Sequence, residues 1–370
     1  METEIVKFSD IDIKNSAGGK GNHPIDAGSF QGKIAAAGKI LKEGGLVAFP
    51  TETVYGLGAD ALNPQASRKI YEAKGRPSDN PLIVHISNMG DLGKITAKVP
   101  EQAKKLAAEF WPGPLTMIFE KSPLVPLETT GGLQTVAVRM PDHPIALGLI
   151  QAGGGFVAAP SANTSGRPSP TTAEHVAQDM EGRIPMILDG GPVGIGIEST
   201  IVDVSGDMPM ILRPGYITKE MVQEAIGPVT LDPGLAAENE AVRPKAPGMK
   251  YKHYAPKGQL ILVDGEREAV QAEIIRLSKE AAAKGQNVGV IGTDETWGSY
   301  PYGIVKSIGT REDEETIARH LYGVLREFDE QDVEIIYSES FSAPGIGQAI
   351  MNRLLKAAGH HVLTAPKREG

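Results

Sequence analysis

The sequence contains no cysteine, and this absence excludes several classes of site at once. Disulfide-stapled folds, cysteine-ligated zinc, iron–sulfur clusters and thiol nucleophiles all need that residue. Long apolar runs are missing too, since none approaches the roughly 18 residues that a membrane-spanning helix needs. The amino terminus, METEIVKF, lacks the pattern of a secretory signal peptide. Together these absences predict a cytoplasmic protein without thiol chemistry.

The sequence also lacks an excess of positive charge. It has 37 Lys and Arg against 46 Asp and Glu, which gives a net charge of −9 at pH 7. This balance argues against a protein that coats nucleic acid or an anionic membrane through overall charge, although it leaves a local basic site open. With 370 residues, 41% of them apolar, the chain is long enough for two or three domains.

Residues 1–227 predict a first domain with a twisted mixed sheet and flanking helices. After a short strand at 5–8, the Gly-, Ser- and Asn-rich residues 14–32 predict a surface arm. Several later strands follow one another without an intervening helix, which favours a mixed sheet over a purely parallel one. We expect helices at 31–42, 64–74, 101–110, 171–180 and 217–226, and strands at 46–49, 82–86, 115–119, 136–139, 156–159, 186–188, 199–204 and 210–212.

Residues 228–257 differ in composition from the rest and predict a linker without regular secondary structure. The segment is rich in proline, and no acidic residue lies between Glu240 and Asp264. Its cations are Arg243, Lys245, Lys250, Lys252 and Lys257. Long unstructured linkers are uncommon in compact proteins and are often functional. Composition alone leaves a functional segment and a solvated tether equally open.

Residues 258–370 predict a smaller second domain. Strands expected at 259–263, 287–291, 304–308 and 333–337 alternate with helices at 268–284, 313–328 and 347–358. This strand–helix alternation favours a small parallel, Rossmann-like sheet.

Two glycine patterns fail as nucleotide motifs. Gly345-Ile-Gly347 follows a strand and opens a helix, but it lacks the third glycine and closes the domain instead of opening it. Gly191 and Gly196 have the outer spacing of a P-loop, but Ile197 stands where that motif needs lysine. No His-Glu-x-x-His pattern occurs either, so hydrolytic zinc chemistry has no support, and we expect no protein metal site.

The stronger signals are polar loops next to strands. One loop, Pro50 to Gly58, carries Thr51, Glu52, Thr53 and Tyr55. The others are Lys74-Gly-Arg-Pro-Ser-Asp-Asn-Pro81, Ala158-Ala-Pro-Ser-Ala-Asn-Thr-Ser-Gly166, Ile197-Glu-Ser-Thr-Ile-Val-Asp203 and Leu212-Arg-Pro-Gly215. Such loops are where α/β proteins place ligands, and Lys, Arg and hydroxyl groups suit phosphate oxygens. Each loop alone also fits an ordinary turn or a solvated helix end. Collectively they predict a site for a phosphorylated ligand.

In this order, the loops resemble one family. The segments PTETVYGLG, KGRPSDNPLIVHI, WPGPLT, TVAVRMPDHP, APSAN, SPT, GIESTIVDV and LRPG are similar to those of the YrdC-type L-threonylcarbamoyladenylate synthases. The segments APGMKYKHYAP and GIGQAIMNRLLKAA resemble the longer form of that family, which carries a C-terminal Rossmann-like domain. The resemblance extends from about Gln31 to Ala358.

The resemblance implies a nucleotidyltransferase. ATP, L-threonine and bicarbonate would give L-threonylcarbamoyl-AMP, diphosphate and water, with Mg²⁺ arriving on the ATP. A threonylcarbamoyl transferase complex would then modify the tRNA adenosine beside the anticodon, so that direct contact of this chain with tRNA would be weak or indirect. No membrane partner is implied.

The resemblance also implies which residues form the site. The catalytic group would be Lys74, Arg76, Ser161 and Asn163. The ATP site would comprise Arg76, Asn80, Thr135, Ser161, Ser169, Arg213 and Tyr251, with Tyr251 reaching it if the linker folds over the site as a lid. The threonine site would comprise Thr53, His85, Arg139, Ala159 and Ser199.

Two other functions compete with this interpretation. An RNA- or tRNA-binding module could use a positive concave face without any catalysis. A carbamoyl-phosphate-using enzyme is the third alternative, because related domains occur in hydrogenase maturation proteins. The zinc-finger cysteines of those proteins are absent from this sequence.

Overall fold

The computed structural model describes residues 1–9, 28–235, 253–341 and 344–366. The described residues form two compact units. Unit 1 lies within Met1–Ser165, Pro170–Gly194 and Glu198–Lys250, and unit 2 lies within Gly166–Ser169, Ile195–Ile197 and Tyr251–Gly370. The domain limits expected at 227 and 258 stay predictions. Among the described residues, no helix combines the length and apolar character needed to cross a membrane.

Unit 1 is built on an eleven-stranded sheet that mixes parallel and antiparallel pairs, which confirms the predicted fold class. Its strand order is β1-β8-β2-β3-β7-β4-β6-β5-β9-β10-β11. The strands are β1 (Glu4–Lys7), β2 (Val47–Phe49), β3 (Gly56–Asp60), β4 (Ile83–His85), β5 (Leu115–Glu120), β6 (Thr135–Arg139), β7 (Val157–Ala158), β8 (Met186–Asp189), β9 (Thr200–Asp203), β10 (Met210–Arg213) and β11 (Thr230–Leu231).

The helices of unit 1 begin and end where local chemistry favours it. They are α2 (Phe30–Lys42), α3 (Pro64–Lys74), α4 (Leu92–Ile95), α5 (Glu101–Phe110), α6 (Pro144–Ala152), α7 (Ala173–Met180) and α8 (Lys219–Ile226). In α3, the Asn63 side chain accepts hydrogen bonds from the N–H groups of Gln65 and Ala66, and Gly75 ends the helix at φ 61°. The ends of α3 therefore place Lys74 in its last turn, directly before a tight change of direction.

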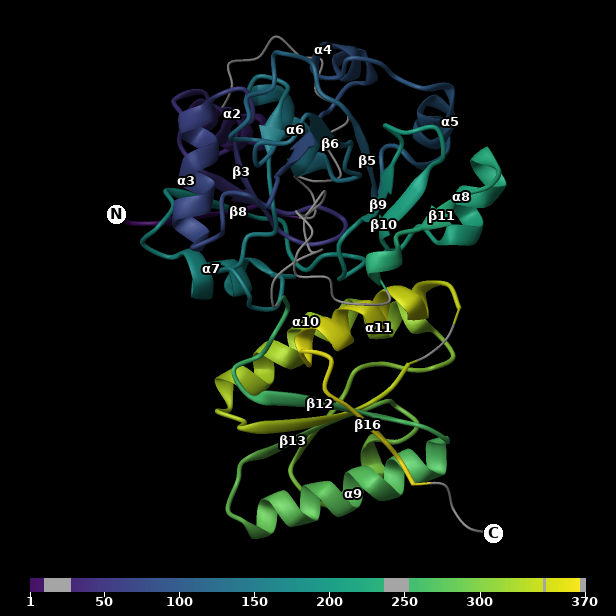
Figure 1. The fold of residues 1–370 in the computed structure, drawn as a ribbon. Helices are drawn as coiled ribbons and strands as arrows, with labels where there is room; N and C mark the ends of the chain where they lie inside the picture. The colour runs from purple at the N-terminus through teal and green to yellow at the C-terminus, as the bar shows by residue number, and fades with distance from the viewer. Residues whose placement is uncertain (10–27, 236–252, 342–343, 367–370) are drawn as a thin grey trace. The chain divides into compact units, whose positions relative to one another are not determined.

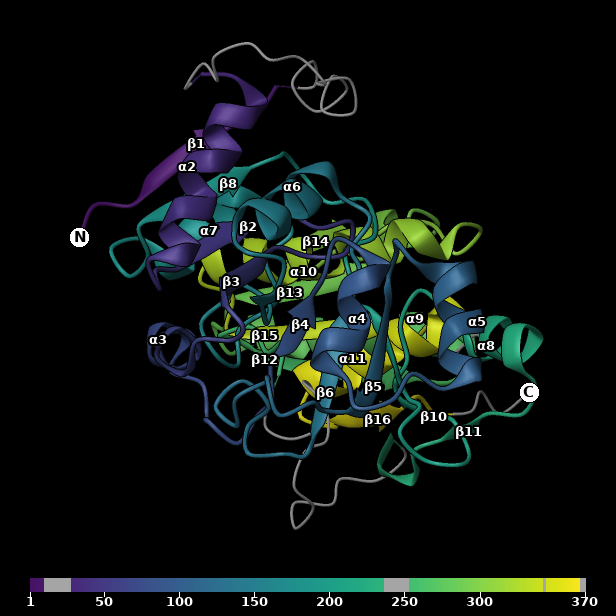
Figure 2. The ribbon, with the colours of Figure 1, turned by 90° about the horizontal axis from the view of Figure 1, so that it is seen from above.

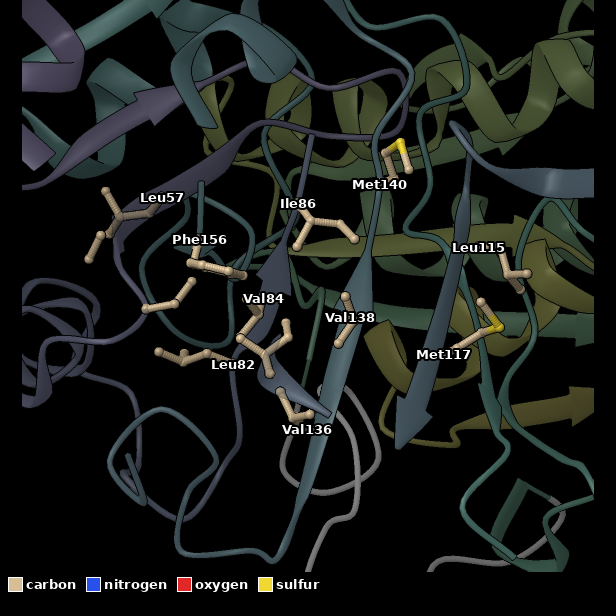
Figure 3. Close-up of a cluster of buried hydrophobic side chains, with 14 of the residues drawn as sticks. Leu57, Leu82, Val84, Ile86, Leu115, Met117, Val136, Val138, Met140 and Phe156 are labelled. Carbon is tan, nitrogen blue, oxygen red and sulfur yellow. The ribbon is translucent and has the colours of Figure 1, made fainter. Parts of the chain in front are cut away.

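The two faces of the central strands have different roles. Alternate residues point to opposite faces of a strand. Val84, Val138 and Met117 point to one face and pack in the main core, which Figure 3 shows with its neighbours. The opposite face carries a small apolar cluster of Ile83, Ile118, Ala137, Ile201 and Leu212. His85, Arg139 and Thr116 each lie two residues from a member of that cluster, so they share its face.

Four elements of unit 1 were not predicted from the sequence: α4, α6, β3 and β11. The sequence of α6, PIALGLIQA, is too uniformly apolar to show a helical period. It packs beside α2 (Figure 2), and Gly38 permits the approach, since a Cβ there would lie 2.5 Å from the Ala152 Cβ. The strand β3 carries glycine at two positions where the neighbouring side chains leave little room for a Cβ, Gly56 and Gly58. A Cβ on Gly58 would lie 2.9 Å from the Phe49 ring.

The first part of the expected linker has regular structure, so the prediction that this segment has none was wrong. β11 pairs in parallel with β10 through Met210–Thr230 and Ile211–Leu231, and a 3₁₀ turn follows at Pro233–Leu235. The strand is only two residues long and carries little apolar periodicity, which is why its pairing leaves no signal in the sequence.

Unit 2 has a five-stranded, fully parallel sheet, as the alternating pattern predicts. Its order is β14-β13-β15-β12-β16. Helix α9 covers one face, and α10 and α11 cover the other (Figure 1). The elements are β12 (Gln259–Asp264), α9 (Arg267–Ala283), β13 (Val288–Gly292), β14 (Ile304–Ser307), α10 (Glu314–Glu330), β15 (Ile335–Glu339), α11 (Ile346–Ala357) and the unpredicted edge strand β16 (Val362–Thr364).

Candidate functional site

Arg139 is the centre of the first group of predicted residues. It is the last residue of β6 and only 4% exposed. Its Nη1 donates to the Thr53 hydroxyl at 2.9 Å, and its Nε donates to the Gly113 carbonyl at 3.2 Å. These two hydrogen bonds fix the plane of the guanidinium. A fixed planar fork of N–H groups is suited to a carboxylate.

His85 lies directly opposite Arg139 in the β4–β6 ladder. Burial, assisted by the positive charge of Arg139, lowers the pKa of His85 to about 3. The ring is therefore neutral at physiological pH. Its Nδ1 lies 3.2 Å from the Ile83 carbonyl, and Ala159 donates its backbone N–H to the same carbonyl at 2.8 Å. A neutral imidazole can serve as a hydrogen-bond partner for a polar ligand without adding charge.

Ser199 connects this group to Arg213. The Ser199 hydroxyl lies 2.8 Å from that of Thr116, which stands opposite Arg139 in the β5–β6 ladder. Arg213, at the end of β10, donates to the Ser199 carbonyl at 3.0 Å and to its hydroxyl at 3.2 Å. The structure therefore brings together the predicted threonine residues Thr53, His85, Arg139, Ala159 and Ser199 and the predicted ATP residue Arg213. We call these six the arginine cluster.

A second group surrounds Lys74. This lysine is 1% exposed, and its Nζ donates to the carbonyls of Ser161, at 2.6 Å, and Asn163. The Ser161 hydroxyl in turn donates to the Asn163 Oδ1 at 2.6 Å. We call Lys74, Ser161 and Asn163 the lysine cluster. Its buried cation fixes a loop of hydroxyl and amide groups, a donor set that suits phosphate oxygens.

Arg76 and Asn80 lie in the turn that follows α3. The Arg76 guanidinium donates to the carbonyls of Asn80 at 3.3 Å and Pro81 at 3.2 Å. The Asn80 side chain is buried, and its Oδ1 accepts no hydrogen bond from the residues that the structure describes. A buried amide oxygen without a donor is costly and is a common feature of sites that await a ligand. Thr135 is half-buried at the start of β6, at the opposite end of the strand from Arg139.

The two clusters are connected through the backbone of unit 1. Leu57 donates its N–H to the Pro160 carbonyl at 2.9 Å, and Ala162 donates to the Tyr55 carbonyl at 2.8 Å. The loop that carries Thr53 is therefore hydrogen-bonded to the loop that carries Ser161.

Two of the predicted ATP residues lie outside the described part of unit 1. Ser169 is fully buried and belongs to unit 2. Tyr251, with the proposed lid around it, lies outside the described residues.

Glu52 is a residue of this site to which the sequence assigned no role. Its Oε1 lies 2.6 Å from the Arg139 Nη2, and both side chains are largely buried. The glutamate stands in the polar loop that follows β2, so the sequence indicated its neighbourhood. Its contact with Arg139, 87 positions away, left no local signal. Thr116 and the Gly113 carbonyl, on the same face, were missed for the same reason.

The donor set does not resemble a protein metal site. Among the described residues, no group of three or more His, Cys, Asp or Glu side chains could hold an ion. The polar groups of both clusters are chiefly Lys, Arg, Ser, Thr and Asn, which offer donors to anions. Anionic substrates therefore fit them better than a cation does.

Two protein-family models match most of the chain. The Sua5/YciO/YrdC family model, described as telomere recombination, matches residues 39–215. The model for the threonylcarbamoyl-AMP synthase C-terminal domain matches residues 217–359.

Full-length relatives extend the match. The threonylcarbamoyl-AMP synthase of Bacillus subtilis (strain 168) is 54% identical over 333 residues, which cover 90% of this chain and 94% of that protein. The one from Pyrococcus abyssi is 48% identical over 331 residues, 90% of this chain and 95% of its own. The crystal structure of P. abyssi Sua5 complexed with L-threonine superimposes with a TM-score of 0.88, at 44% identity, over 98% of this chain and 99% of that one. The resemblance found in the motifs is confirmed: the chain belongs to the two-domain Sua5 family of threonylcarbamoyl-AMP synthases.

Proposed function

We propose that this chain makes L-threonylcarbamoyl-AMP from L-threonine, bicarbonate and ATP, with release of diphosphate. The observation that carries the proposal is the arginine cluster, in which a buried guanidinium of fixed orientation lies beside a neutral histidine. That arrangement suits the carboxylate and hydroxyl of threonine. The relatives are named for this synthesis, and the P. abyssi protein was crystallised with L-threonine. Catalysis is therefore favoured over an RNA-binding module without it.

The two clusters divide the chemistry between them. Arg139 would bind the threonine carboxylate, and Thr53, His85, Ser199 and the Ala159 backbone would surround the rest of the amino acid. The lysine cluster, with Arg76 and Asn80, would bind the triphosphate, together with Thr135, Ser169, Arg213 and Tyr251. In nucleotidyl transfer the protein mainly positions reactants and stabilises developing negative charge. A carbamate formed on the threonine nitrogen would attack the α-phosphorus, and diphosphate would leave.

Magnesium and the later partners belong to the same proposal. Because the clusters offer donors and not carboxylates, Mg²⁺ would enter on the phosphate oxygens of ATP. The AMP adduct is a reactive mixed anhydride, so a threonylcarbamoyl transferase complex must consume it. The tRNA adenosine would be the final acceptor, and this chain's own contact with tRNA would be weak or indirect.

Mass spectrometry of the products tests the proposal. Incubation with ATP, threonine and bicarbonate should give threonylcarbamoyl-AMP, and omission of any one substrate should abolish it. Arg76→Ala should lower adduct formation by at least about 100-fold, since loss of one preorganised donor to a transition state costs that much. Arg68→Ala is the matched control, because Arg68 lies on the preceding helix α3 but is exposed and paired with Glu128. An adduct that persists without bicarbonate, or an Arg76 variant with normal diphosphate release, would contradict the assignment.

A further inference from the structure

Glu52 stands out among the buried charged groups of unit 1 because its carboxylate lacks hydrogen bonds. Both carboxylate oxygens are buried, and neither has a hydrogen-bond partner among the described residues. The contact with Arg139 has the 2.6 Å distance of an ion pair, but its angles are not those of a hydrogen bond. A buried carboxylate normally accepts several hydrogen bonds, because desolvation of the charge is otherwise uncompensated. This carboxylate is therefore held ready for another donor.

The surroundings of Glu52 concentrate negative charge next to one cation. Asp142, just beyond β6, has its pKa raised by burial and by the negative charge of Glu52. His143 follows, and burial lowers its pKa to about 4 although Glu52 acts in the opposite direction, so this ring is neutral. The groups that face Glu52 are thus one cation, Arg139, one carboxyl, Asp142, and one neutral imidazole, His143. The His143 Nδ1 is also buried without a hydrogen-bond partner.

An adjacent cation and anion of this kind match a zwitterion. Threonine presents a carboxylate and an ammonium on the same carbon. Its carboxylate can take the Nη2 side of Arg139, which contacts Glu52. Threonine would then share the guanidinium with Glu52. The threonine ammonium would then lie next to the Glu52 carboxylate.

We propose that Glu52 is the catalytic base that removes a proton from the threonine ammonium. This proposal rests on the proposed function. Threonine cannot react with bicarbonate as an ammonium, since the nitrogen lone pair is then bonded to a proton. The step is therefore required by the chemistry, and Glu52 is the carboxylate placed beside the group that binds the amino acid.

The proton and bond balance is complete without a further reagent. One N–H proton passes to a Glu52 oxygen, which frees the nitrogen lone pair. The nitrogen attacks the carbon of bicarbonate, a C–N bond forms, and the C–OH bond breaks. The hydroxide leaves as water with the proton that Glu52 received, and a second N–H proton goes to solvent. The product is the carbamate, and Glu52 returns to its ionised form for the next turnover.

Glu52→Gln tests the proposal because it keeps the shape and removes the base. At pH 7.5 we expect kcat for adduct formation to fall about 100-fold, the usual contribution of general base catalysis. The difference in kcat between the wild-type protein and Glu52→Gln should become smaller as the pH rises towards 9, because the threonine amine then loses its proton without a catalytic base. Glu52→Asp should recover part of the rate. Glu120→Gln, at the exposed end of β5, is the matched control.

The outcomes separate this proposal from its rivals. A merely structural role for Glu52 would raise the KM for threonine and leave kcat unchanged, with the same deficit at every pH. That result, or a Gln variant within about threefold of the wild-type kcat at pH 7.5, would overturn the assignment. If the wild-type protein itself forms no adduct from the three substrates, the proposed function fails and not the role of Glu52.

Discussion

Two buried glutamates, one in each unit, differ in how they are compensated. Glu339, at the end of β15, is 1% exposed and accepts hydrogen bonds from Thr296 and Tyr300 while it pairs with Arg311 at 2.6 Å. Within the part of the chain that the structure describes, Glu52 in unit 1 has one ion-pair contact and no hydrogen bond. The protein thus buries carboxylates in two ways, and the number of hydrogen-bond donors around each carboxylate indicates its role. A fully compensated carboxylate stabilises a fold, whereas an under-compensated one remains available to a ligand.

The network around Glu339 also affects its neighbours. Burial, and then the negative charge of Glu339, raise the pKa of Tyr300. The phenol therefore stays protonated and remains a donor at any physiological pH. The Arg311 guanidinium in addition lies 4.9 Å from the centre of the Phe341 ring. The cluster lies at the carboxyl edge of the unit 2 sheet, where α/β proteins place ligands. The Glu339 carboxylate, however, already has hydrogen-bond donors and an ion-pair partner. Its role is therefore to stabilise the fold.

The largest effect should come from Glu339→Ala. Removal of this carboxylate leaves a half-buried guanidinium and two buried hydroxyls without their acceptor, which should cost about 3–5 kcal/mol of unfolding free energy. Hydrogen exchange followed by mass spectrometry resolves the peptides of unit 2 and measures that loss. Glu327→Ala is the control, since Glu327 is exposed and its pair with Lys306 should contribute less than about 1 kcal/mol. Equal losses in the two variants would break the contrast between compensated and exposed carboxylates.

The second-largest effect should be a difference between the two units in how their stability falls as the pH is lowered. In unit 1, His85 and His143 have pKa values of about 3 and about 4, below the ordinary 6.5. The unfolded chain therefore binds protons first as the pH falls. Each histidine should remove about 1.4 kcal/mol of stability per pH unit below 6.5, down to its own folded-state pKa.

In unit 2 the decline should begin only at lower pH. Burial would raise the pKa of Glu295, but hydrogen bonds from Thr293, Thr310 and the Arg311 backbone outweigh it and lower that pKa to about 2. A depressed carboxyl pKa contributes stability above about 4.5 that is lost as the pH falls towards 2. As the pH falls from 6.5 to 5, unit 1 should therefore lose stability before unit 2 does, and hydrogen exchange measures this difference. Between pH 6.5 and 5, the stability of unit 1 should fall less steeply with pH in His143→Gln than in the parent protein. An unchanged slope would contradict the role of that histidine.

Much of the fold follows from local sequence signals. The helix at 101–110 was predicted to the residue, and the N-cap Asn63 and the glycine after Lys74 mark both ends of α3. The mixed sheet and the parallel second sheet follow from the order of strands and helices. By contrast, α6, β3, β11 and β16 depend on neighbours distant in the sequence. Their own residues are uniformly apolar, glycine-rich or too few to show a period.

The sequence identifies the loops that form the site but not the contacts between them. The resemblance of the motifs assigned Arg139, His85 and Thr53 to one substrate, and the structure places them together. The register that brings His85 opposite Arg139 joins strands 54 positions apart, which only the folded sheet can show. The contact of Glu52 with Arg139 is of the same kind. Contacts between residues far apart in the chain leave no local pattern, so they could not be predicted from the sequence.

The smallest effect should be that of Glu52→Gln on stability, and it sharpens the comparison most. An amide at this position removes a buried charge that accepts no hydrogen bond, while Arg139 keeps its bonds to Thr53 and Gly113. The relieved desolvation and the lost ion-pair attraction nearly cancel, so the unfolding free energy should change by less than about 1 kcal/mol. Hydrogen exchange of the unit 1 peptides measures this difference. A loss as large as that of Glu339→Ala would mean that Glu52 stabilises the fold as Glu339 does. A near-zero change, joined to a large loss of rate, identifies a charge that the protein keeps for its substrate.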